Sequence, residues 1–494
     1  MISSTAQLRN AVIAAVAIVG IVFGWLALEI PKGILSSSGD EMLTAERSRE
    51  MLVLGRSEVH FNLKPSFEKP PLQYWLTSFT LARLQNRTLA VRIWPWIYGI
   101  LTAAALGRLA LVSQPDRPWL VPLTVAILTS FPLFATETCR GMLDTGLAFF
   151  TTTTILFAQL ARTNPRWWIG TAIACLLGCL QKIPVPFLIW LLILGARMTS
   201  PAERNQLKSR WLGFSILSCV VAMLIWPAFQ MLRFQINYQH LFHQEVVDWL
   251  GPEHLGAQPY LEIPYRLIVS SACGIFILAA PFVIFFWKKG EFGRLPREIS
   301  VACLGLIAIE ILFNFRHVRY TEPIIPALCF LLAIVAERIL SRRGLTRTGA
   351  LAVLGVLLLA GFIQTKMQID FRRQKDFTDE KLVAEQLGAL QRPGLRIVLV
   401  KAVKVGSDLH FASFYLFHGN LRTPVEKYTV EEIRQSPPSA PLVGVCVTRD
   451  LPTVQAAYPT AKIEFRRGEF VVWSVDEARI GRVSKSLSKT AERI

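Results

Sequence analysis

Charged residues are scarce in this sequence. Asp, Glu, Lys and Arg make up 18% of its 494 residues, whereas 52% of the residues are hydrophobic. A soluble enzyme of this length carries more charge and a smaller apolar fraction. The composition therefore excludes an ordinary soluble enzyme and predicts a polytopic membrane protein.

Other features are missing as well. Most of the eight cysteines lie in apolar runs, and Cys446 alone falls in the C-terminal region, so we predict neither an external disulfide framework nor a metal-cysteine motif. Cys175 and Cys179 stand four residues apart, which favours small residues at a helix contact over a ligand pair.

The chain shows no solenoid repeat and no pair of related halves, which transporters tend to have. No A-x-A cleavage site follows the first apolar run, so we expect an uncleaved first helix.

Long apolar runs are abundant. A helix needs roughly 20 apolar residues to cross the ~30 Å hydrocarbon core of a bilayer, and about eleven runs of suitable character precede the C-terminal region. They cover residues 11–30, 89–112, 119–136, 143–161, 167–180, 185–196, 211–232, 265–287, 299–313, 323–339 and 350–364. The fifth and sixth are short and separated by Pro184, so they could form one broken hairpin.

The basic residues predict the orientation. If the first span runs outward from the cytoplasm, every short inner loop carries Arg or Lys, as the positive-inside rule requires. This distribution explains much of the net charge of +18 without a nucleic-acid partner, although a basic chain would otherwise suggest one. It also places residues 31–88, residues 233–264 and the C-terminal region on the outer side, in a periplasm or an equivalent space.

Two of the outer segments are long. Residues 40–55 and 77–87 have helical character, and we expect two amphipathic interfacial helices that flank an irregular middle. The polar but aromatic segment at 233–264 suits a structured lid at the membrane surface.

No further span follows residue 364. β-Branched runs at 395–403 and 440–448, paired alternating runs around Gly468, a helical run at 379–390 and a capping box from Thr429 to Glu432 predict a small α/β or α+β domain. The predicted organisation is mainly α. It consists of a membrane helical bundle at 1–365, a soluble α/β domain at 366–482 on the outer side, and a disordered tail at 483–494.

Acidic residues stand at the outer ends of the predicted helices. Asp40 and Glu41 follow the first span, and Asp144 opens the fourth. A carboxylate at the depth of Asp144 is costly, which predicts a functional role, with an ion pair to Arg140 on the same helix as the structural alternative. Asp40 and Asp144 could face one cavity if both loops fold onto the same outer surface.

Basic residues on the same side run against the positive-inside trend, and we take their reason to be a phosphate ligand. These residues are Arg49, Lys69, Lys182, Arg316, His317 and Arg319, with Tyr320 beside the last.

Four motifs, in this order, resemble the GT-C glycosyltransferases. They are GDE followed by RSREM in the first outer loop, FEKPPLQYW at 67–75, MLDTGLAFF at 142–150 and RYTEPIIPALCFLLA from residue 319. The set is most similar to the branch that holds the bacterial aminoarabinose lipid A transferases and the protein O-mannosyltransferase-like enzymes. The similarity covers roughly residues 1–365 and is strongest before residue 150.

The resemblance implies an inverting transferase of the bacterial inner membrane with its active site on the periplasmic side. It would move a sugar from a polyprenyl-phosphate donor, of the undecaprenyl-phosphate type, to a lipid, glycan or protein acceptor of the cell envelope, as the relatives do to the lipid A of lipopolysaccharide. Asp40, Glu41 and Asp144 would be catalytic. Lys69, Arg319 and Tyr320 would contact the donor phosphate, helped by Lys182 and Arg49.

The chemistry of these residue types agrees with that implication. An acceptor hydroxyl must lose its proton as the new bond forms, and a positioned carboxylate such as Asp40 can take it. Fixed cations such as Lys69 stabilise the charge that develops on the departing phosphate.

Other readings stay open at this point. A transporter or flippase for a lipid-linked substrate, or a non-catalytic scaffold, would also carry many spans. Glu68 with His240 or His243 could bind a divalent cation, and we leave that metal site open rather than predict a cofactor. We expect a monomer that contacts membrane lipids and no nucleic acid.

Overall fold

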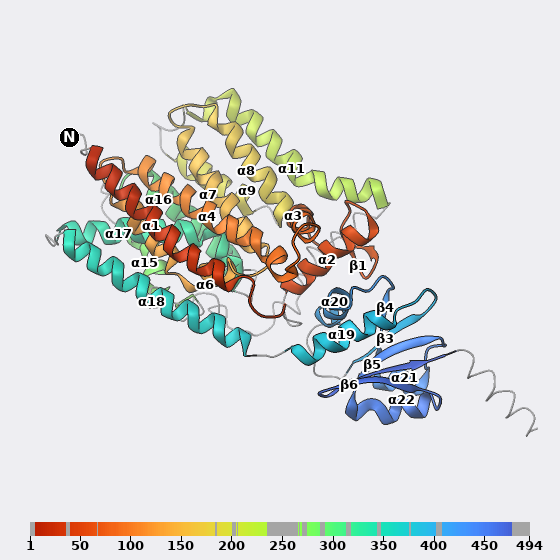
Figure 1. Cartoon of the computed structure of the whole chain (residues 1–494). Helices are drawn as coiled ribbons and strands as arrows, with labels where there is room; N and C mark the ends of the chain where they lie inside the picture. Colours follow the sequence, from red (N-terminus) through yellow and green to blue (C-terminus); the bar gives the residue numbers. More distant parts are fainter. Residues whose placement is uncertain are drawn as a thin grey trace, which may run out of the picture. The chain divides into compact units, whose positions relative to one another are not determined.

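The computed structural model describes residues 5–35, 40–66, 68–182, 185–199, 204, 206–234, 265, 267–268, 274–286, 292–312, 318–342, 347–374, 377–401 and 408–476. The chain forms two compact units (Figure 1). The first is helical and comprises Met1–Pro31, Phe67–Gln73 and Arg92–Arg372. The second comprises Lys32–Ser66, Tyr74–Val91 and Arg373–Ile494, so it joins the first outer loop to the C-terminal region. The predicted domain boundary at residue 366 stays a prediction.

Apolar runs form the helices of the first unit. Three described helices are long and apolar enough to cross a bilayer, and four others are apolar but shorter. The predicted bundle of apolar helices is therefore confirmed, while the count of eleven spans stays a prediction. The described elements are α1 (Thr5–Glu29), α4 (Arg87–Ser113, whose first turn belongs to the second unit), α5 (Leu120–Thr129), α6 (Pro132–Glu137), α7 (Asp144–Leu160), α8 (Trp167–Gln181), α9 (Val185–Met198), η1 (Gln206–Lys208), α11 (Arg210–Phe234), α15 (Gly274–Phe286), α16 (Arg294–Leu312), η3 (Val318–Ile324), α17 (Ile325–Arg342) and α18 (Arg347–Arg373).

The third predicted span, at 119–136, is wrong as a single helix. α5 ends at Thr129, and α6 begins at Pro132. Proline lacks a backbone N–H and disfavours the helical conformation in the preceding residue, and Phe131 accordingly has an extended backbone with φ −85° and ψ 109°. Ten residues of helix rise only about 15 Å, so α5 is too short to cross a bilayer by itself.

Basic residues meet a buried acid at one end of this unit. Glu298 of α16 pairs with Arg162, which follows α7, and accepts a hydrogen bond from Nε of Arg197 in α9 at 3.0 Å. Glu298 and Arg197 are buried. Removing an ion from water costs several kcal/mol unless it is paired, so this cluster fastens the ends of α7, α9 and α16 together.

The second unit contains a five-stranded sheet in the order β4-β3-β5-β7-β6. β3 (Arg396–Lys401) pairs in parallel with β4 (Val425–Thr429) and β5 (Leu442–Val447), and β7 (Phe470–Val475) and β6 (Lys462–Arg467) extend the sheet in antiparallel fashion. Helices α19 (Thr378–Leu390) and α20 (Asp408–His418) cover one face, and α21 (Val430–Gln435) and α22 (Leu451–Ala457) cover the other (Figure 1).

This layering confirms the predicted small α/β domain. β5 is buried along its whole length because helices lie on both faces of the sheet. The capping box predicted at the start of α21 is present, with Thr429 and Glu432 bonded to each other's backbone N–H. β6 and β7 form the predicted hairpin, in which Gly468 takes a positive φ of 53°.

Helix α2 (Asp40–Leu54) is buried on all sides from Glu41 to Met51. Its Met42 and Ala45 pack into the same apolar core as α19 and α20. A helix that is buried around its whole circumference is not amphipathic, so the prediction of an interfacial helix is wrong here. The reason is that its charged side chains find partners inside the unit, as Arg49 does with Glu46 at 2.7 Å.

The rest of the first outer loop contributes a short hairpin, β1 (His60–Phe61) with β2 (Lys64–Pro65), and helix α3 (Leu72–Leu81). α3 begins five residues earlier than predicted. Trp75 and Phe79 are 41% and 51% exposed on one side of it, an apolar outward face that is typical of an interfacial helix.

Glu50 of α2 gives the second unit a pH-dependent stability. Burial, followed by the neighbouring Glu46 carboxylate, raises the pKa of Glu50 from 4.5 to about 8. The folded unit therefore binds this proton more tightly than the unfolded chain does. The contribution of Glu50 to the free energy of unfolding falls as pH rises from about 4.5 to about 8, by at most about 1.4 kcal/mol per pH unit.

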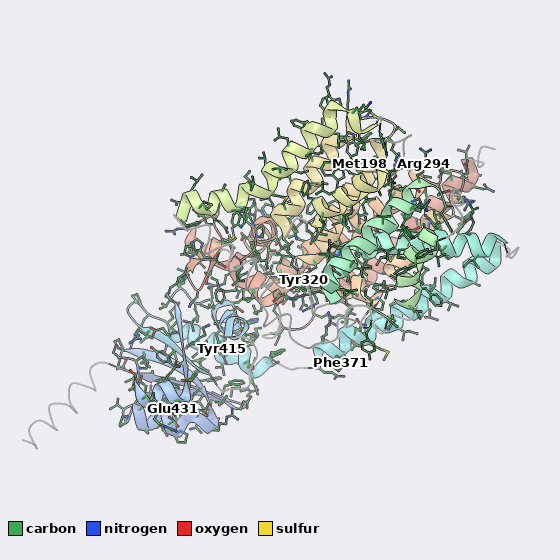
Figure 2. The ribbon with its side chains drawn as sticks, turned by 180° about the vertical axis from the view of Figure 1, so that it is seen from behind. Met198, Arg294, Tyr320, Phe371, Tyr415 and Glu431 are labelled. Atoms are coloured by element: carbon green, nitrogen blue, oxygen red, sulfur yellow. The ribbon has the colours of Figure 1, made fainter. Side chains whose placement is uncertain are left out.

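We expect Glu50→Gln to weaken this dependence. The midpoint of thermal unfolding of the detergent-solubilised chain, measured by tryptophan fluorescence, should drop less between pH of about 5 and about 8 in Glu50→Gln than in the wild type. Glu431→Gln on the exposed side of α21 (Figure 2) is the control. The same pH dependence in all three proteins would contradict the assignment to Glu50.

Candidate active site

Asp144 and Lys182 form a buried ion pair. Asp144 is the first residue of α7, and Lys182 follows the last residue of α8. Nζ of Lys182 donates to Oδ1 of Asp144 at 2.5 Å, and the two side chains are 8% and 3% exposed. Arg140, the alternative partner, donates to Glu137 at 2.8 Å. The partner of Asp144 thus comes from another helix, and the pair keeps both ions neutralised away from water.

Tyr320 of η3 lies beside this pair. Nζ of Lys182 is 5.2 Å from the centre of the Tyr320 ring, and Cζ of Arg319 is 5.8 Å from the centre of the same ring. Both distances are within the range of cation-π interactions. The structure therefore brings together three segments that are far apart in the sequence, which carry Asp144, Lys182, and Arg319 with Tyr320. Their predicted roles stay predictions.

Glu322 belongs to this site, although it is not among the predicted site residues. The side chain is fully buried, and Oε1 accepts a hydrogen bond from Thr145 at 2.9 Å. Burial first, and the Asp144 carboxylate second, raise the pKa of Glu322 well above its usual value. Thr145 follows Asp144, so this bond attaches η3 to the first turn of α7. Its signal in the sequence is an acid next to an apolar run, the same signal that marked Asp144.

A second hydrogen-bond link attaches a different segment. Nε2 of Gln181, the residue before Lys182, donates to Oε1 of Gln73 at 3.0 Å and to the carbonyl of Leu143 at 3.0 Å. Gly146 of α7 makes this arrangement fit, because a Cβ at that position would stand 2.3 Å from Nε2 of Gln181. Neither glutamine was predicted as a site residue.

Lys69 and Glu68 lie on the segment that Gln73 anchors. Phe67–Gln73 belongs to the helical unit, although the chain on either side of it belongs to the other unit. Lys69 is half-buried, and Glu68 is exposed. The Gln73–Gln181 bond thus ties the predicted phosphate-binding segment to the residue next to Lys182.

Asp40, Glu41 and Arg49 lie in the second unit. Asp40 is half-buried at the start of α2, and its carbonyl accepts a hydrogen bond from Thr44 at 3.1 Å. Glu41 and Arg49 are buried. The hypothesis that Asp40 and Asp144 face one cavity stays a prediction.

The metal site stays open. Among the residues that the structure describes, no group of three or more His, Cys, Asp or Glu side chains is placed to hold a metal ion. His240 and His243, and also Arg316 and His317, fall outside the described residues.

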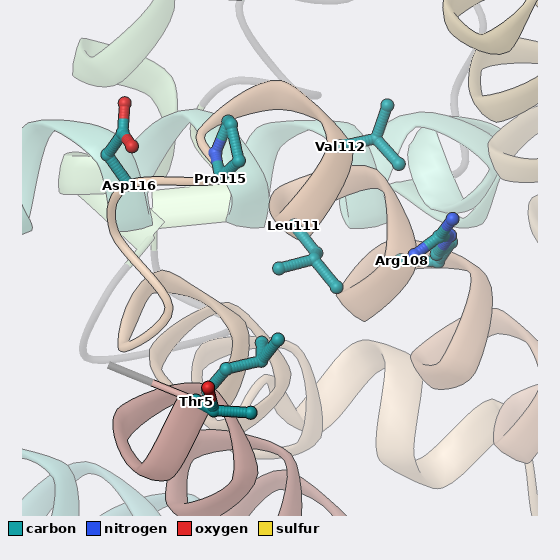
Figure 3. A pocket seen from close by; sticks show the side chains of 7 residues that line it. Thr5, Arg108, Leu111, Val112, Pro115 and Asp116 are labelled. Carbon is teal, nitrogen blue, oxygen red and sulfur yellow. The ribbon is translucent and has the colours of Figure 1, made fainter. Parts of the chain in front are cut away.

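A cavity of about 530 Å³ lies elsewhere in the helical unit (Figure 3). None of the predicted site residues lines it, so we do not assign it to the candidate site. It is lined by Thr5 and Leu8 at the start of α1, by Arg108, Leu111 and Val112 at the end of α4, and by Pro115 and Asp116 just after that helix.

Helix α7 separates the candidate site from the Glu298 cluster. Asp144 starts this helix and Arg162 follows its end, so its seventeen residues place the two groups about 25 Å apart. Figure 2 shows Tyr320 away from Met198 and Arg294, which lie at the end of α9 and the start of α16. The two charged clusters therefore mark opposite ends of the helical unit.

Comparison with known proteins finds relatives in one group. Residues 68–226 match the family described as dolichyl-phosphate-mannose-protein mannosyltransferase. The chain is 29% identical over 260 residues to an undecaprenyl phosphate-alpha-4-amino-4-deoxy-L-arabinose arabinosyl transferase of Proteus mirabilis. That alignment covers 51% of this chain and 47% of the relative, so the chain spans about half the length of that protein.

Two solved structures share the fold. ArnT from Cupriavidus metallidurans, bound to undecaprenyl phosphate, superposes with a TM-score of 0.68 at 15% identity over 96% of this chain and 98% of its own. An oligosaccharyltransferase of Archaeoglobus fulgidus, in complex with Zn and sulfate, gives 0.54 at 11% identity over 83% of this chain and 61% of its own. These matches confirm the predicted resemblance to the GT-C superfamily of membrane glycosyltransferases, in the branch of the aminoarabinose and protein mannosyltransferases.

Proposed function

We propose that this protein is an inverting glycosyltransferase of the bacterial inner membrane, which transfers a sugar from an undecaprenyl-phosphate-type donor to a lipid, glycan or protein acceptor at the periplasmic face. The observation that carries the proposal is the buried Lys182–Asp144 pair, with Arg319 and Tyr320 beside it, at one end of a GT-C helical unit. The fold is shared with an ArnT that was crystallised with undecaprenyl phosphate.

The reaction is a single displacement at the anomeric carbon. A bond forms between the acceptor oxygen and that carbon, while the bond from the carbon to the donor phosphate oxygen breaks. The acceptor proton passes to a carboxylate, for which we propose Asp40 with Glu41 as its neighbour. The electron pair of the broken bond stays on the phosphate, where Lys182, Lys69 and Arg319 stabilise the developing charge.

The Lys182–Asp144 ion pair suits a site that binds an anionic donor. Without a donor, Asp144 neutralises the Lys182 ammonium, so the buried cation costs little. When a phosphate arrives, the ammonium can share its three N–H donors between the phosphate and Asp144, which keeps Lys182 in place. Tyr320 adds a polarisable ring near the same ammonium.

The positions of the charges support the proposed orientation. The Glu298 cluster contains Arg162, which follows α7, and Arg197, in the last turn of α9. The positive-inside rule assigns both helix ends to the cytoplasmic side. Since Asp144 starts the same helix that Arg162 follows, the candidate site then lies on the periplasmic side. We propose that the protein acts as a monomer.

Asp40→Asn tests the proposed base. We expect the transfer rate to fall by about a hundredfold or more, because an amide cannot take the acceptor proton. Mass spectrometry of envelope lipids and glycans would show the loss of one sugar mass, with protein abundance checked by immunoblot. Asp116→Asn, an exposed acid of the helical unit, is the matched control. Unchanged product together with altered solute uptake would favour a transporter and overturn the proposal.

Substitutions at Lys182 and Asp144, singly and together, separate the role of the Lys182 charge in stability from its role in binding the donor phosphate. Lys182→Gln alone leaves the Asp144 carboxylate buried and unpaired, which should destabilise the protein by about 3–5 kcal/mol. Lys182→Gln with Asp144→Asn removes both charges and should recover most of that stability. We expect neither variant to bind undecaprenyl phosphate as tightly as the wild type does, measured by native mass spectrometry. Full binding in the stable double variant would exclude Lys182 as a phosphate contact.

A further inference from the structure

The end of helix α20 binds the buried Arg49 of α2. Nη2 of Arg49 donates to the carbonyl of Leu421 at 2.8 Å, and Nη1 donates to Oδ1 of Asn420 at 3.2 Å. The same guanidinium forms a two-point bond with Glu46 at 2.8 and 2.7 Å. A cation at this position also interacts favourably with the negative C-terminal end of the helix dipole. The donors of Arg49 are thus engaged by α2 itself and by the cap of α20.

The local backbone explains why an asparagine stands at this cap. The N–H groups of Gly419, Asn420 and Leu421 bond back to Tyr415, Phe417 and Leu416, which closes the end of the helix. Asn420 has a positive φ of 49°, a conformation that asparagine tolerates better than most residues other than glycine. Its side chain is then directed to the guanidinium of Arg49.

A second polar link attaches the β1–β2 hairpin to the sheet. Asn62 accepts from the N–H of Val425 at 2.7 Å and donates to the carbonyl of Val425 at 2.9 Å. Val425 starts β4, which is the edge strand, so the amide of Asn62 satisfies backbone groups that no neighbouring strand pairs. Asn62 also has a positive φ, of 55°, as a two-residue hairpin turn requires.

The β1–β2 hairpin is also hydrogen-bonded to α2. The N–H of Leu63, the second turn residue, donates to Oε2 of Glu50 at 2.9 Å. The α/β domain therefore reaches α2 by two routes, through Asn420 to Arg49 and through Asn62 and Leu63 to Glu50. Apolar packing of Met42 and Ala45 against the core of the domain adds to both.

We propose that the C-terminal α/β domain is a positioning element for the transfer reaction. Its positioning residue is Asn420, and Asn62 of the β1–β2 hairpin, which binds the edge strand β4, is the second. They hold α2, whose first residue is Asp40, in one place. The inference rests on the proposed function, because it takes Asp40 to be the base. It assigns Arg49 to this contact rather than to the donor phosphate.

The test uses two asparagine-to-glycine substitutions in the full-length protein. Asn62→Gly and Asn420→Gly delete the side-chain bonds but keep the positive φ, so the turn and the cap can still form. Asn164→Gly in an exposed turn after α7 is the matched control. Hydrogen exchange of the α2 amides is measured alongside kcat and the KM for the lipid-linked donor.

We expect the double variant Asn62→Gly/Asn420→Gly to exchange α2 amides faster and to lose about tenfold or more in kcat, because small displacements of a catalytic group are costly. The donor KM should change less than about twofold. A raised KM with an unchanged kcat would assign Arg49 to the phosphate and overturn the proposal. Faster exchange with wild-type kcat, or unaltered exchange, would also overturn it.

A rescue variant distinguishes the loss of positioning from simple misfolding as the cause of a lower kcat. Asn420→Asp keeps an acceptor oxygen for Arg49 and tolerates the positive φ, so it should restore both slow exchange and kcat. Failure of Asp40→Asn to affect transfer would remove the proposed function, but the exchange data would still show whether the two asparagines hold α2.

Discussion

An ionised side chain that leaves water must find a partner, and this requirement shapes the protein. Asp144 and Lys182 are partners for each other, at 2.5 Å between the start of α7 and the end of α8. Glu298 has Arg162 and Arg197 as its partners. Apolar packing alone gives helices of this composition many alternative registers. A pairing of opposite charges in a low-dielectric interior selects one of them, because each wrong register leaves a charge unpaired.

The same requirement explains why α2 can be both highly charged and fully buried. Its charged side chains have partners inside the second unit, where Arg49 is bonded to Glu46 and to the α20 cap. Arg47 bonds the hydroxyl of Tyr74 at 3.1 Å and lies 5.9 Å from the centres of the Phe61 and Tyr74 rings. Such a helix has no apolar stripe to bind a membrane, so its position is fixed by polar contacts within its unit and by the packing of Met42 and Ala45 in the core of that unit.

The sequence predicted what periodicity and composition encode. Apolar runs located the helices, the capping box at Thr429 located α21, and alternation around Gly468 located the β6–β7 hairpin. It missed what depends on tertiary contacts. α20 has no clear apolar period because the unit buries every residue of its second half, from Ala412 to Phe417. The short edge strand β4 alternates too briefly to be recognised.

The candidate site shows the same division. Asp144 and Lys182 were predicted because a charge beside an apolar run is conspicuous. That they pair with each other was not predicted, because only the fold brings residues 144 and 182 together. Gln73, Gln181 and Gly146 gave no signal, since neutral polar and small residues are common in helical bundles. Their role becomes visible only in the bonds of Gln181 to Gln73 and Leu143.

The middle of α7 argues for chemistry at its end rather than transport through its length. No charged residue lies between Asp144 and Arg162. The hydroxyls of Thr151, Thr152 and Thr153 each bond to a carbonyl four residues earlier at 2.8 Å, which satisfies them within the helix. A transported ion or headgroup would need ligands near the midplane. The charges of this segment stand instead at its two ends, where Asp144 begins the helix and Arg162 follows it.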